Sequence, residues 1–487
     1  MTLSKAYGTR RRGFLAVGSA MAAVALLAAA CSSSKPKSSN TPTATGGGSS
    51  SSPTAAPSSG GGGGSAAPAG CDAYKDYMGH SGTTVTMFGS IISPESDSLN
   101  KSWADFQKCT GITIKYEGSN DFESQLPVRV QGGTAPDLAI IPQPGLLQQM
   151  VALGAVKKPP AGVVANEDKY WNAAWKQYGS VNGTFYAAPQ SANMKSFVWY
   201  SPKMFAKAGY QVPTTWKDMM ALSDKIAADN PNSKPWCGGI GSGTATGWPA
   251  TDWLEEVVLG QYGGQVYDDW ISHKIKFDSP QIKGAMQTVA NWMQNPKYVN
   301  GGFGGVSTIA TTTFQDAGKP IVPSVNKCWM LQQASFYGAQ WASIDKNLTI
   351  GPDGDVWVFK LPPVDPSVTK DEVEGGGEFT TAFSDRPEVQ AVQTYLSSAE
   401  WATSRVKVAP GWVSANNGVP ADAYSNPLDK LSAQYLTDQN ATFRFDASDL
   451  MPAAVGSGAE WKEFTNWFGQ GKSIDAVAKA VDAAWPS

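Results

Sequence analysis

Histidine is almost absent from this chain, and its scarcity removes several kinds of chemistry. Only His80 and His273 occur among 487 residues. Two histidines are too few for a histidine-based zinc site and leave little scope for acid–base catalysis by histidine. The chain contains no P-loop, HExxH, GxSxG or EF-hand sequence, and the glycine-rich stretch 237–243 lacks the GxGxxG spacing of a dinucleotide site. We therefore expect no cofactor and no bound metal.

Charged residues are also scarce, at 16% of the chain, and their signs are unevenly distributed. Residues 1–71 hold six Lys and Arg and no acid, so 32 basic residues face 41 acidic ones in the remainder, a net charge of −9. An acidic surface repels phosphate backbones, so nucleic acid is not an expected partner. Long apolar runs are missing beyond residue 31, which argues against several membrane spans.

The one long apolar run lies at the N-terminus. Arginines occupy positions 10–12, an uncharged run continues to Ala30, and small residues precede Cys31. The pattern is typical of an export signal and resembles a twin-arginine leader that ends in a bacterial lipobox, in which Cys31 is lipidated. Export by the general secretory route and a plain transmembrane anchor are the alternatives. In each case we expect the folded part to be exported and tethered to the outer face of the cytoplasmic membrane.

Residues 32–70 form the expected tether. Of these 39 residues, 30 are Ser, Gly, Pro or Thr, and none is aromatic or a large aliphatic. Such a segment buries too little apolar surface to offset the entropy of ordering it, so we predict a flexible linker.

Four cysteines follow the signal: Cys71, Cys109, Cys237 and Cys328. An even number of cysteines in an exported chain predicts disulfides, and their spacing alone allows three pairings.

Beyond the linker, strand patterns alternate with helix patterns. The first predicted strands span residues 84–88, 112–116 and 137–141. Between them we predict one helix that starts near Pro94 and stops at Gly111, and a second that starts after Asp121. This order predicts an α/β sheet, and similar units recur up to a last helix that starts at Ser473.

Aromatic residues are plentiful, with 18 Trp, 16 Tyr and 18 Phe, and several lie beside acids or amides. A sugar has apolar faces that stack on aromatic rings and hydroxyls that bind Asp, Glu, Asn, Gln and Arg. The stretches 247–253 and 328–333 combine both features and favour a sugar site. These aromatics could instead belong to the core. Asp252 with Glu255 and Glu256 could form a glycosidase couple, or these acids could be solvated charges on a helix face.

Several motifs resemble the extracellular solute-binding proteins of carbohydrate ABC importers. These motifs are VTMFG at 85–89, YEGSNDFE at 116–123 and QGGTAPD at 131–137, and the stretches 142–145, 247–253, 332–336 and 444–452 resemble the α-glucoside-binding branch. The resemblance covers residues 83–487. It implies a type II periplasmic-binding-protein-like α/β fold with two lobes, each a sheet flanked by helices, and a ligand cleft between them. It also implies a monomeric receptor that is not an enzyme and that delivers an oligosaccharide of the α-glucoside class to ABC permease subunits.

The resemblance further implies that the chain crosses between the lobes more than once. We expect lobe one to comprise residues 83–188 with 352–397, and lobe two residues 189–351 with 398–487. On this map the pairs Cys71–Cys109 and Cys237–Cys328 each stay within one lobe and leave closure free, so we prefer that pairing.

Matching of motif positions gives the expected ligand contacts. They are Ser90, Ser93, Glu95, Asp121, Gln143, Asn193, Trp248, Asp252, Trp329, Gln333, Glu378 and Arg444. Trp248 is expected in a loop before a helix that starts near Thr251, with its indole stacked on a glucosyl ring and Asp252 accepting hydrogen bonds from hydroxyls. Asp121 could instead cap a helix, and the segment 375–378 could serve as hinge or as contact. A secreted glycoside-active enzyme and a receptor for another solute on the same fold are the other function classes.

Overall fold

The chain starts with the expected alternation of strands and helices. In the computed structural model, these elements are β1 (Thr84–Gly89), α1 (Glu95–Ser102), α2 (Ala104–Thr110), β2 (Thr113–Gly118), α3 (Phe122–Gln131) and β3 (Leu138–Ile141). Leu99, Trp103 and Phe106 are fully buried, as their helical spacing predicts. The one helix expected here is broken into two at Trp103, where the backbone turns to φ −114° and ψ 14°. Gly111 ends α2 in the left-handed conformation, at φ 71°.

The structure describes residues 68–367, 372–408, 410–438 and 441–486, and all of them belong to one compact unit, residues 65–487. The expected export signal, Cys31 and all but the last three linker residues lie outside the described residues. Among the described helices, none combines the length and the apolar character needed to cross a membrane.

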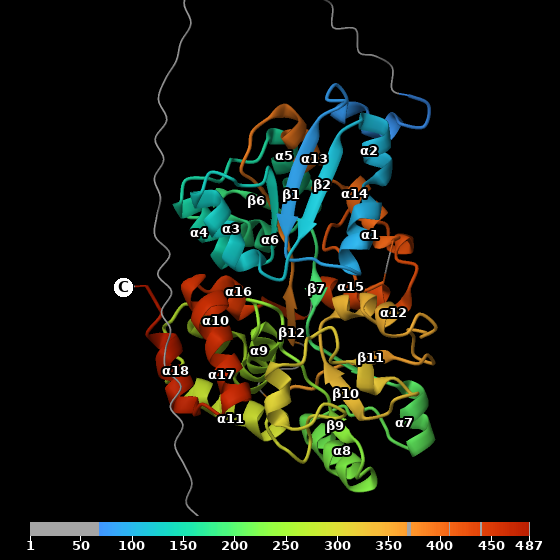
Figure 1. Cartoon of the computed structure of the whole chain (residues 1–487), viewed down its shortest axis with the longest axis vertical. Coiled ribbons are helices and arrows are strands. Elements are labelled where there is room, and N and C mark those ends of the chain that lie inside the picture. The colour runs from blue at the N-terminus through green and yellow to red at the C-terminus, as the bar shows by residue number, and fades with distance from the viewer. Residues whose placement is uncertain (1–67, 368–371, 409, 439–440, 487) are drawn as a thin grey trace, which may run out of the picture. The chain divides into compact units, whose positions relative to one another are not determined.

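A five-stranded sheet in the order β2-β1-β3-β13-β6 forms the centre of lobe one, the upper lobe in Figure 1. Strands β1, β2 and β3 are parallel, while β13 (Phe379–Ala382) lies antiparallel between β3 and β6 (Ala187–Pro189). Met87 and Phe88 belong to different apolar clusters, so both faces of the sheet are covered, as is usual for parallel strands. The remaining elements of this lobe are η1 (Asp72–Tyr77), α4 (Pro144–Ala152), α5 (Ala161–Tyr170), α6 (Ala173–Tyr178), β4 (Ser180–Val181), β5 (Thr184–Phe185), α13 (Pro387–Leu396), α14 (Ala399–Val406) and η5 (Ala421–Ala423).

Lobe two is built on a four-stranded sheet in the order β11-β8-β10-β9 (Figure 1). Its strands are β8 (Phe197–Tyr200), β9 (Lys234–Trp236), β10 (Cys328–Gln332) and β11 (Trp357–Lys360). Its helices are α7 (Pro202–Ala208), α8 (Trp216–Asp229), α9 (Trp248–Tyr262), α10 (Gly264–Ile271), α11 (Pro280–Met293), η2 (Val306–Ala310), η3 (Lys319–Ile321), η4 (Ser335–Ala339), α12 (Trp341–Ile344), α15 (Pro427–Thr437), α16 (Ala447–Leu450), η6 (Ala454–Glu460), α17 (Trp461–Gln470) and α18 (Ile474–Asp482). Ser473 caps α18 by accepting a hydrogen bond from the Ala476 N–H, as predicted.

A third, small sheet lies where the chain crosses between the lobes. Its order is β14 (Thr442–Phe445), β12 (Glu372–Gly376) and β7 (Asn193–Met194), and Figure 1 shows β7 and β12 between the two lobes. This arrangement confirms the expected two-lobed α/β fold with a sheet in each lobe.

Two of the expected lobe boundaries differ from the structure. Residues 352–376 were expected in lobe one, but β11 pairs with β8 in lobe two and the chain returns only between β12 and β13. Residues 398–424 were expected in lobe two, but Trp401 Nε1 donates to Ser102 Oγ at 3.0 Å in lobe one. The pairing partners of these segments lie far away in the sequence, so local pattern could not place them.

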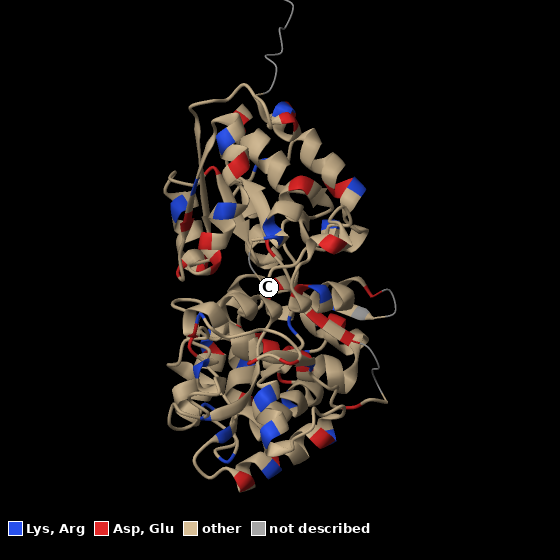
Figure 2. Ribbon diagram, turned by 90° about the vertical axis from the view of Figure 1, so that its right-hand side faces the viewer, with Lys and Arg blue, Asp and Glu red and all other residues tan. Residues whose placement is uncertain are grey.

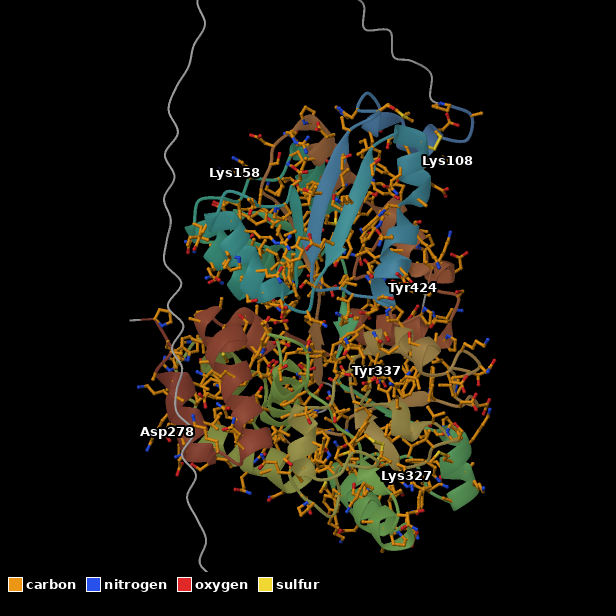
Figure 3. All side chains as sticks on the ribbon, in the orientation of Figure 1. Lys108, Lys158, Asp278, Lys327, Tyr337 and Tyr424 are labelled. Atoms are coloured by element: carbon orange, nitrogen blue, oxygen red, sulfur yellow. A yellow bond between two sulfur atoms is a disulfide. The ribbon has the colours of Figure 1, made fainter. Side chains whose placement is uncertain are left out.

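Both disulfides have the preferred pairing, which confirms that prediction. Cys71 pairs with Cys109 at a Cα–Cα distance of 5.5 Å, and Cys237 pairs with Cys328 at 5.6 Å. In Figure 3 the first bond is drawn beside Lys108 and the second near Lys327. Each bond stays within one lobe and therefore does not tie the lobes together.

Candidate functional site

A pocket lies between the lobes, and residues of both lobes line it. It holds about 1020 Å³ of space free of protein atoms, part of it open to solvent. Ser90 follows β1 and Gln143 follows β3, so lobe one reaches the pocket at the carboxyl ends of its parallel strands. Ligands of open α/β sheets bind at such strand ends.

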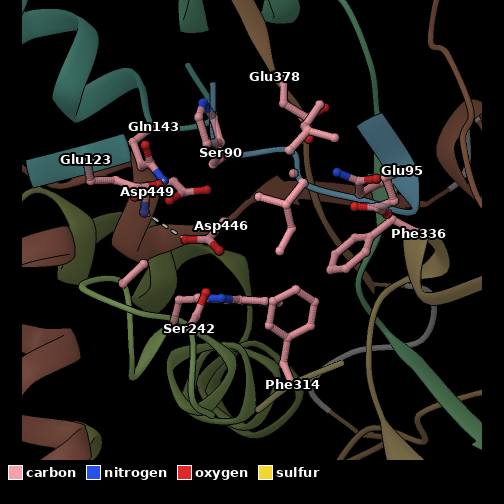
Figure 4. Close-up of a pocket in the computed structure, with 18 of the residues that line it drawn as sticks. Ser90, Glu95, Glu123, Gln143, Ser242, Phe314, Phe336, Glu378, Asp446 and Asp449 are labelled. Carbon is pink, nitrogen blue, oxygen red and sulfur yellow. Dashed lines mark hydrogen bonds between the residues drawn. The ribbon is translucent and has the colours of Figure 1, made fainter. Parts of the chain in front are cut away.

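One side of the pocket presents unused hydrogen-bond acceptors. Gln143 Nε2 donates to Glu123 Oε1 at 3.2 Å, while Glu123 Oε2 and Gln143 Oε1 are buried without a protein partner. Burial raises the pKa of Glu123 to about 7. Leaving such atoms unpaired costs free energy that a ligand hydroxyl would offset. Figure 4 shows these two residues together with Asp449 on one side, and Glu95 with Phe336 on the other.

The opposite side carries an arginine and two glutamates that it influences electrostatically. Burial raises the pKa of Glu95 to about 8 and that of Glu378 to about 7, and the Arg405 charge opposes both shifts. Arg405 is only 3% exposed, yet its Nε and Nη1 atoms have no hydrogen-bond partner. Its guanidinium lies 4.9 Å from the centre of the Trp412 ring. Trp412 Nε1 is likewise buried and unpaired, so this side offers unused donors.

Aromatic rings form much of the lobe-two wall. Trp248 packs edge-on against Phe314 at 5.2 Å between ring centres and tilted against Phe336 at 5.9 Å. All three rings line the pocket, and Figure 4 shows Phe314 below it with Glu378 above. The helix α9 starts at Trp248 itself, not near Thr251 as expected. A proline in the first turn of a helix has no intrahelical N–H bond to lose, so Pro249 permits this earlier start.

Beside Trp248 of the aromatic wall, Lys195 joins two aspartates. Its Nζ donates to Asp252 Oδ1 at 2.8 Å and to Asp446 Oδ2. Burial acts to lower the pKa of Lys195, but the charges of Asp252 and Asp446 raise it well above its usual range. Asp446 also caps α16 by accepting from Asp449 N at 2.7 Å. Lys195 and Asp446 line the pocket, whereas Asp252 does not.

The same cluster contains the possible cation ligands found among the described residues. Oxygens of Asp252, Glu374 and Asp446 lie within 4.8 Å of one another. Because the Lys195 ammonium pairs with two of the three carboxylates, it supplies positive charge at this place. Figure 2 shows acidic segments spread over both lobes, several of them in lobe two near the boundary with lobe one.

The structure brings together half of the sequence-predicted contacts. Those that line the pocket are Ser90, Glu95, Gln143, Asn193, Trp248 and Glu378. Gly376 and Gly377 also line the pocket, where the chain passes from β12 to β13. Contact of these residues with a ligand stays a prediction.

Three predicted lobe-two contacts are engaged elsewhere, which corrects their expected place in the cleft wall. Trp329 packs 5.0 Å from the Tyr210 ring in the core and donates to Ser233 Oγ. Arg444 forms a two-point ion pair with Asp268 at 2.8 and 2.9 Å. Gln333 is 2% exposed, and its Oε1 accepts from Ala334 N. Local motif resemblance could not show in which direction these side chains point.

Asp252, Asp121 and Ser93 also lie outside the pocket lining. Asp252 is 1% exposed and faces Lys195, so it supports the wall instead of forming it. Ser93 Oγ donates to Asp97 Oδ2 at 2.9 Å beside α1. Asp121 occupies the N-cap position of α3, but its side chain caps nothing there and accepts from Thr244 N instead.

Sequence reasoning missed several residues of the pocket. The charged ones are Glu123, Lys195, Arg405, Asp446 and Asp449. Lys195 and Arg405 lie in stretches with no recognisable pattern. Asp446 and Asp449 had a usable signal, because two acids three residues apart after a strand pattern indicate a capped helix start.

Comparison with known proteins gives one family and several relatives. The family model described as bacterial extracellular solute-binding protein matches residues 93–405. The alpha-glucosides-binding periplasmic protein AglE of Rhizobium meliloti (strain 1021) is 34% identical over 86% of this chain and 90% of its own length. The osmoprotective compounds-binding protein GgtB of Synechocystis sp. is 33% identical over 82% of this chain and 92% of its own.

Solved structures agree with the fold. A crystal structure of the bacterial solute receptor AcbH superposes with a TM-score of 0.69 at 19% identity, covering 83% of this chain and 98% of that receptor. At this identity the likeness supports the two-lobed architecture.

Proposed function

The chain belongs to the bacterial extracellular solute-binding proteins, and from that membership we propose that it binds an α-glucoside and delivers it to an ABC permease. AglE supports this ligand class, because it is named for binding alpha-glucosides. GgtB, which is named for binding osmoprotective compounds, supports only the role of a solute receptor. We further propose that the protein works as a monomer and binds its ligand without chemical turnover.

The observation that carries the proposal is the set of unpaired polar atoms around the pocket. Buried acceptors on Glu123 and Gln143 lie on one side, and buried donors on Arg405 and Trp412 lie on another. The indole of Trp248, only partly buried, supplies an apolar face. A sugar offers apolar faces and both donors and acceptors around its ring, so it matches this combination.

A panel of disaccharides tests the proposal. Trehalose, maltose and sucrose are titrated by calorimetry, with cellobiose as the β-linked control, and unfolding temperatures are recorded with each sugar. We expect an α-glucoside to bind and to raise the unfolding temperature by mass action, with no sugar released on prolonged incubation. Absence of binding by every α-glucoside would refute the proposed ligand class. Hydrolysis of any of them would favour a glycoside-active enzyme.

We also propose that Cys31 carries a lipid, which would hold the receptor at the membrane from which the permease takes its ligand. The basis is the sequence around Cys31 alone. In a bacterial host, the full chain is expected to label with radioactive palmitate and to fractionate with membranes. The Cys31→Ser variant is expected to do neither. Equal labelling of both proteins would contradict the proposal.

A further inference from the structure

Lobe one and lobe two touch directly beside the pocket. Thr244 lies in the turn that precedes α9 in lobe two, and its N–H donates to Asp121 Oδ1 of lobe one at 3.1 Å. Thr244 Oγ1 and Ser124 Oγ lie 3.2 Å apart. Asn120 and Ser242 flank this contact and line the pocket, so the contact lies at the pocket rim.

The Asp121 carboxylate binds the other lobe and not its own helix. It stands at the N-cap of α3, where an aspartate ordinarily accepts bonds from the first helical N–H groups, but it makes no such bond. Its Oδ1 instead accepts a hydrogen bond from Thr244 N, across 123 positions of sequence. Stability of α3 therefore does not explain this side chain.

A second close contact involves Gly145 in the first turn of α4. A Cβ built on Gly145 would lie 1.9 Å from the Met451 carbonyl oxygen and 3.3 Å from Ala453 N, both in lobe two. The φ of Gly145 is not positive, so close approach of the lobes accounts for the glycine. Gln143, two residues before Gly145, lines the pocket, and so does Asp449, two residues before Met451.

We propose that these two contacts, Asp121 with Thr244 and Gly145 with Met451, form a closure latch that holds the lobes together over a bound ligand. Asp121 and Gly145 are positioning residues: they set affinity and residence time without touching the ligand. The proposal rests on the proposed function, in which the lobes close over a sugar. The apparent affinity for the ligand equals the affinity of the closed form multiplied by the fraction of protein that adopts this form. A contact that favours the closed form therefore raises the apparent affinity.

Substitutions at both contacts test the latch on the full chain, with the tightest-binding sugar among trehalose, maltose and sucrose as the probe. Asp121→Ala is expected to raise Kd about tenfold through faster dissociation, while Asp121→Asn, which keeps the acceptor oxygen, stays within about threefold of wild type. Gly145→Ala is expected to weaken binding by at least as much as Asp121→Ala. The matched controls are Asp105→Ala, an exposed aspartate on α2, and Gly305→Ala, where an added Cβ meets nothing within 4 Å.

The unliganded proteins separate a latch from a merely structural role. Because the contacts act in the closed form, the unfolding temperatures of ligand-free Asp121→Ala and Gly145→Ala are expected to equal that of wild type. The radius of gyration of wild type is expected to fall on sugar binding by more than that of Gly145→Ala. A loss of ligand-free stability, or wild-type affinity in both variants, would overturn the latch and leave the proposed function intact.

A cross-link tests the latch without any ligand. In the double variant Ser124→Cys with Thr244→Cys, mild oxidation is expected to join positions 124 and 244, as peptide mapping would show. The oxidised protein is expected to have a smaller radius of gyration and a sugar association rate reduced at least tenfold, both reversed by reduction. If no 124–244 bond forms under oxidation, the latch is refuted whether or not any sugar binds.

Discussion

Trp248 and Trp253 lie on the same helix, but their surroundings predict different effects of truncation. Trp248 lines the pocket and is partly buried, whereas Trp253 is 1% exposed and packs against Phe468. We expect Trp248→Ala to lower sugar affinity at least tenfold, about 1.4 kcal/mol, with a small loss of stability. Trp253→Ala is expected to cost about 3–5 kcal/mol of unfolding free energy. Calorimetric titration and denaturant unfolding of both variants measure the two effects. Equal losses of stability would place Trp248 in the core.

The buried pairs of Lys195 predict a strong asymmetry between substitutions. Lys195→Met leaves both Asp252 and Asp446 without their cation, which is expected to cost about 3–5 kcal/mol. Asp252→Asn keeps the Lys195–Asp446 pair and removes one of several buried carboxylates, so its cost is expected to be clearly smaller. Denaturant unfolding at pH 7 compares the two variants. A loss as large for Asp252→Asn as for Lys195→Met would show that the aspartate is indispensable to the cluster.

The crossing sheet contains one position, Gly375 of β12, that has no room for a side chain. A Cβ on Gly375 of β12 would lie 2.5 Å from a ring carbon of Phe443 in β14 and 2.7 Å from the Asn193 carbonyl in β7. Gly375→Ala therefore forces the three strands apart, and we expect a loss of about 1–3 kcal/mol from overpacking. Gly305→Ala serves as the control because its Cβ meets no atom within 4 Å. Unchanged unfolding free energy in Gly375→Ala would show that the sheet can shift without cost.

Sequence pattern predicted elements well where their neighbours in the sequence are also their neighbours in space. Residues 84–89 and 138–141 form neighbouring parallel strands of one sheet as expected, since their apolar runs fit a sheet buried on both faces. The pattern could not show that β11 joins β8 or that α14 packs in lobe one, because the pairing partners lie far along the chain.

Only half of the predicted contact residues line the pocket, and the reason is related. Ser90 and Gln143 follow strands, and strand ends point into the cleft of such folds. The inner or outer direction of Arg444 depends on a β-strand register that local sequence leaves open. Lys195 and Arg405 belong to no sequence motif, and their carboxylate neighbours come from distant parts of the chain. Only the assembled fold brings these charges together.

The molecule as a whole holds many carboxyls whose pKa is raised. Burial raises the pKa of Glu95 and Glu167 to about 8 and that of Glu123, Glu378 and Asp429 to about 7. Such a group binds more protons folded than unfolded, so the stability it confers is full below its unfolded pKa near 4 and disappears as pH rises through the folded value. We expect the unfolding free energy to fall from about pH 5 to about pH 8, measured by denaturant titration at each pH.

Glu167 isolates one part of this dependence. It is 1% exposed, lies outside the pocket, and neither carboxylate oxygen has a hydrogen-bond partner. Because glutamine does not titrate, Glu167→Gln is expected to flatten the decline of stability between about pH 5 and about pH 8. The exposed Asp105→Asn is expected to leave it unchanged. A Glu167→Gln curve parallel to wild type would contradict the assignment.

The position of β13 in its sheet determines when the sheet of lobe one can be completed during synthesis of the chain. This strand, at residues 379–382, inserts between β3 (residues 138–141) and β6 (residues 187–189), which are both synthesised much earlier. During synthesis, the sheet of the first lobe therefore lacks its β13 strand until the second-lobe elements up to β11 have been made. Backbone groups of β3 and β6 remain exposed during that interval, and exposed strand edges invite pairing with other chains.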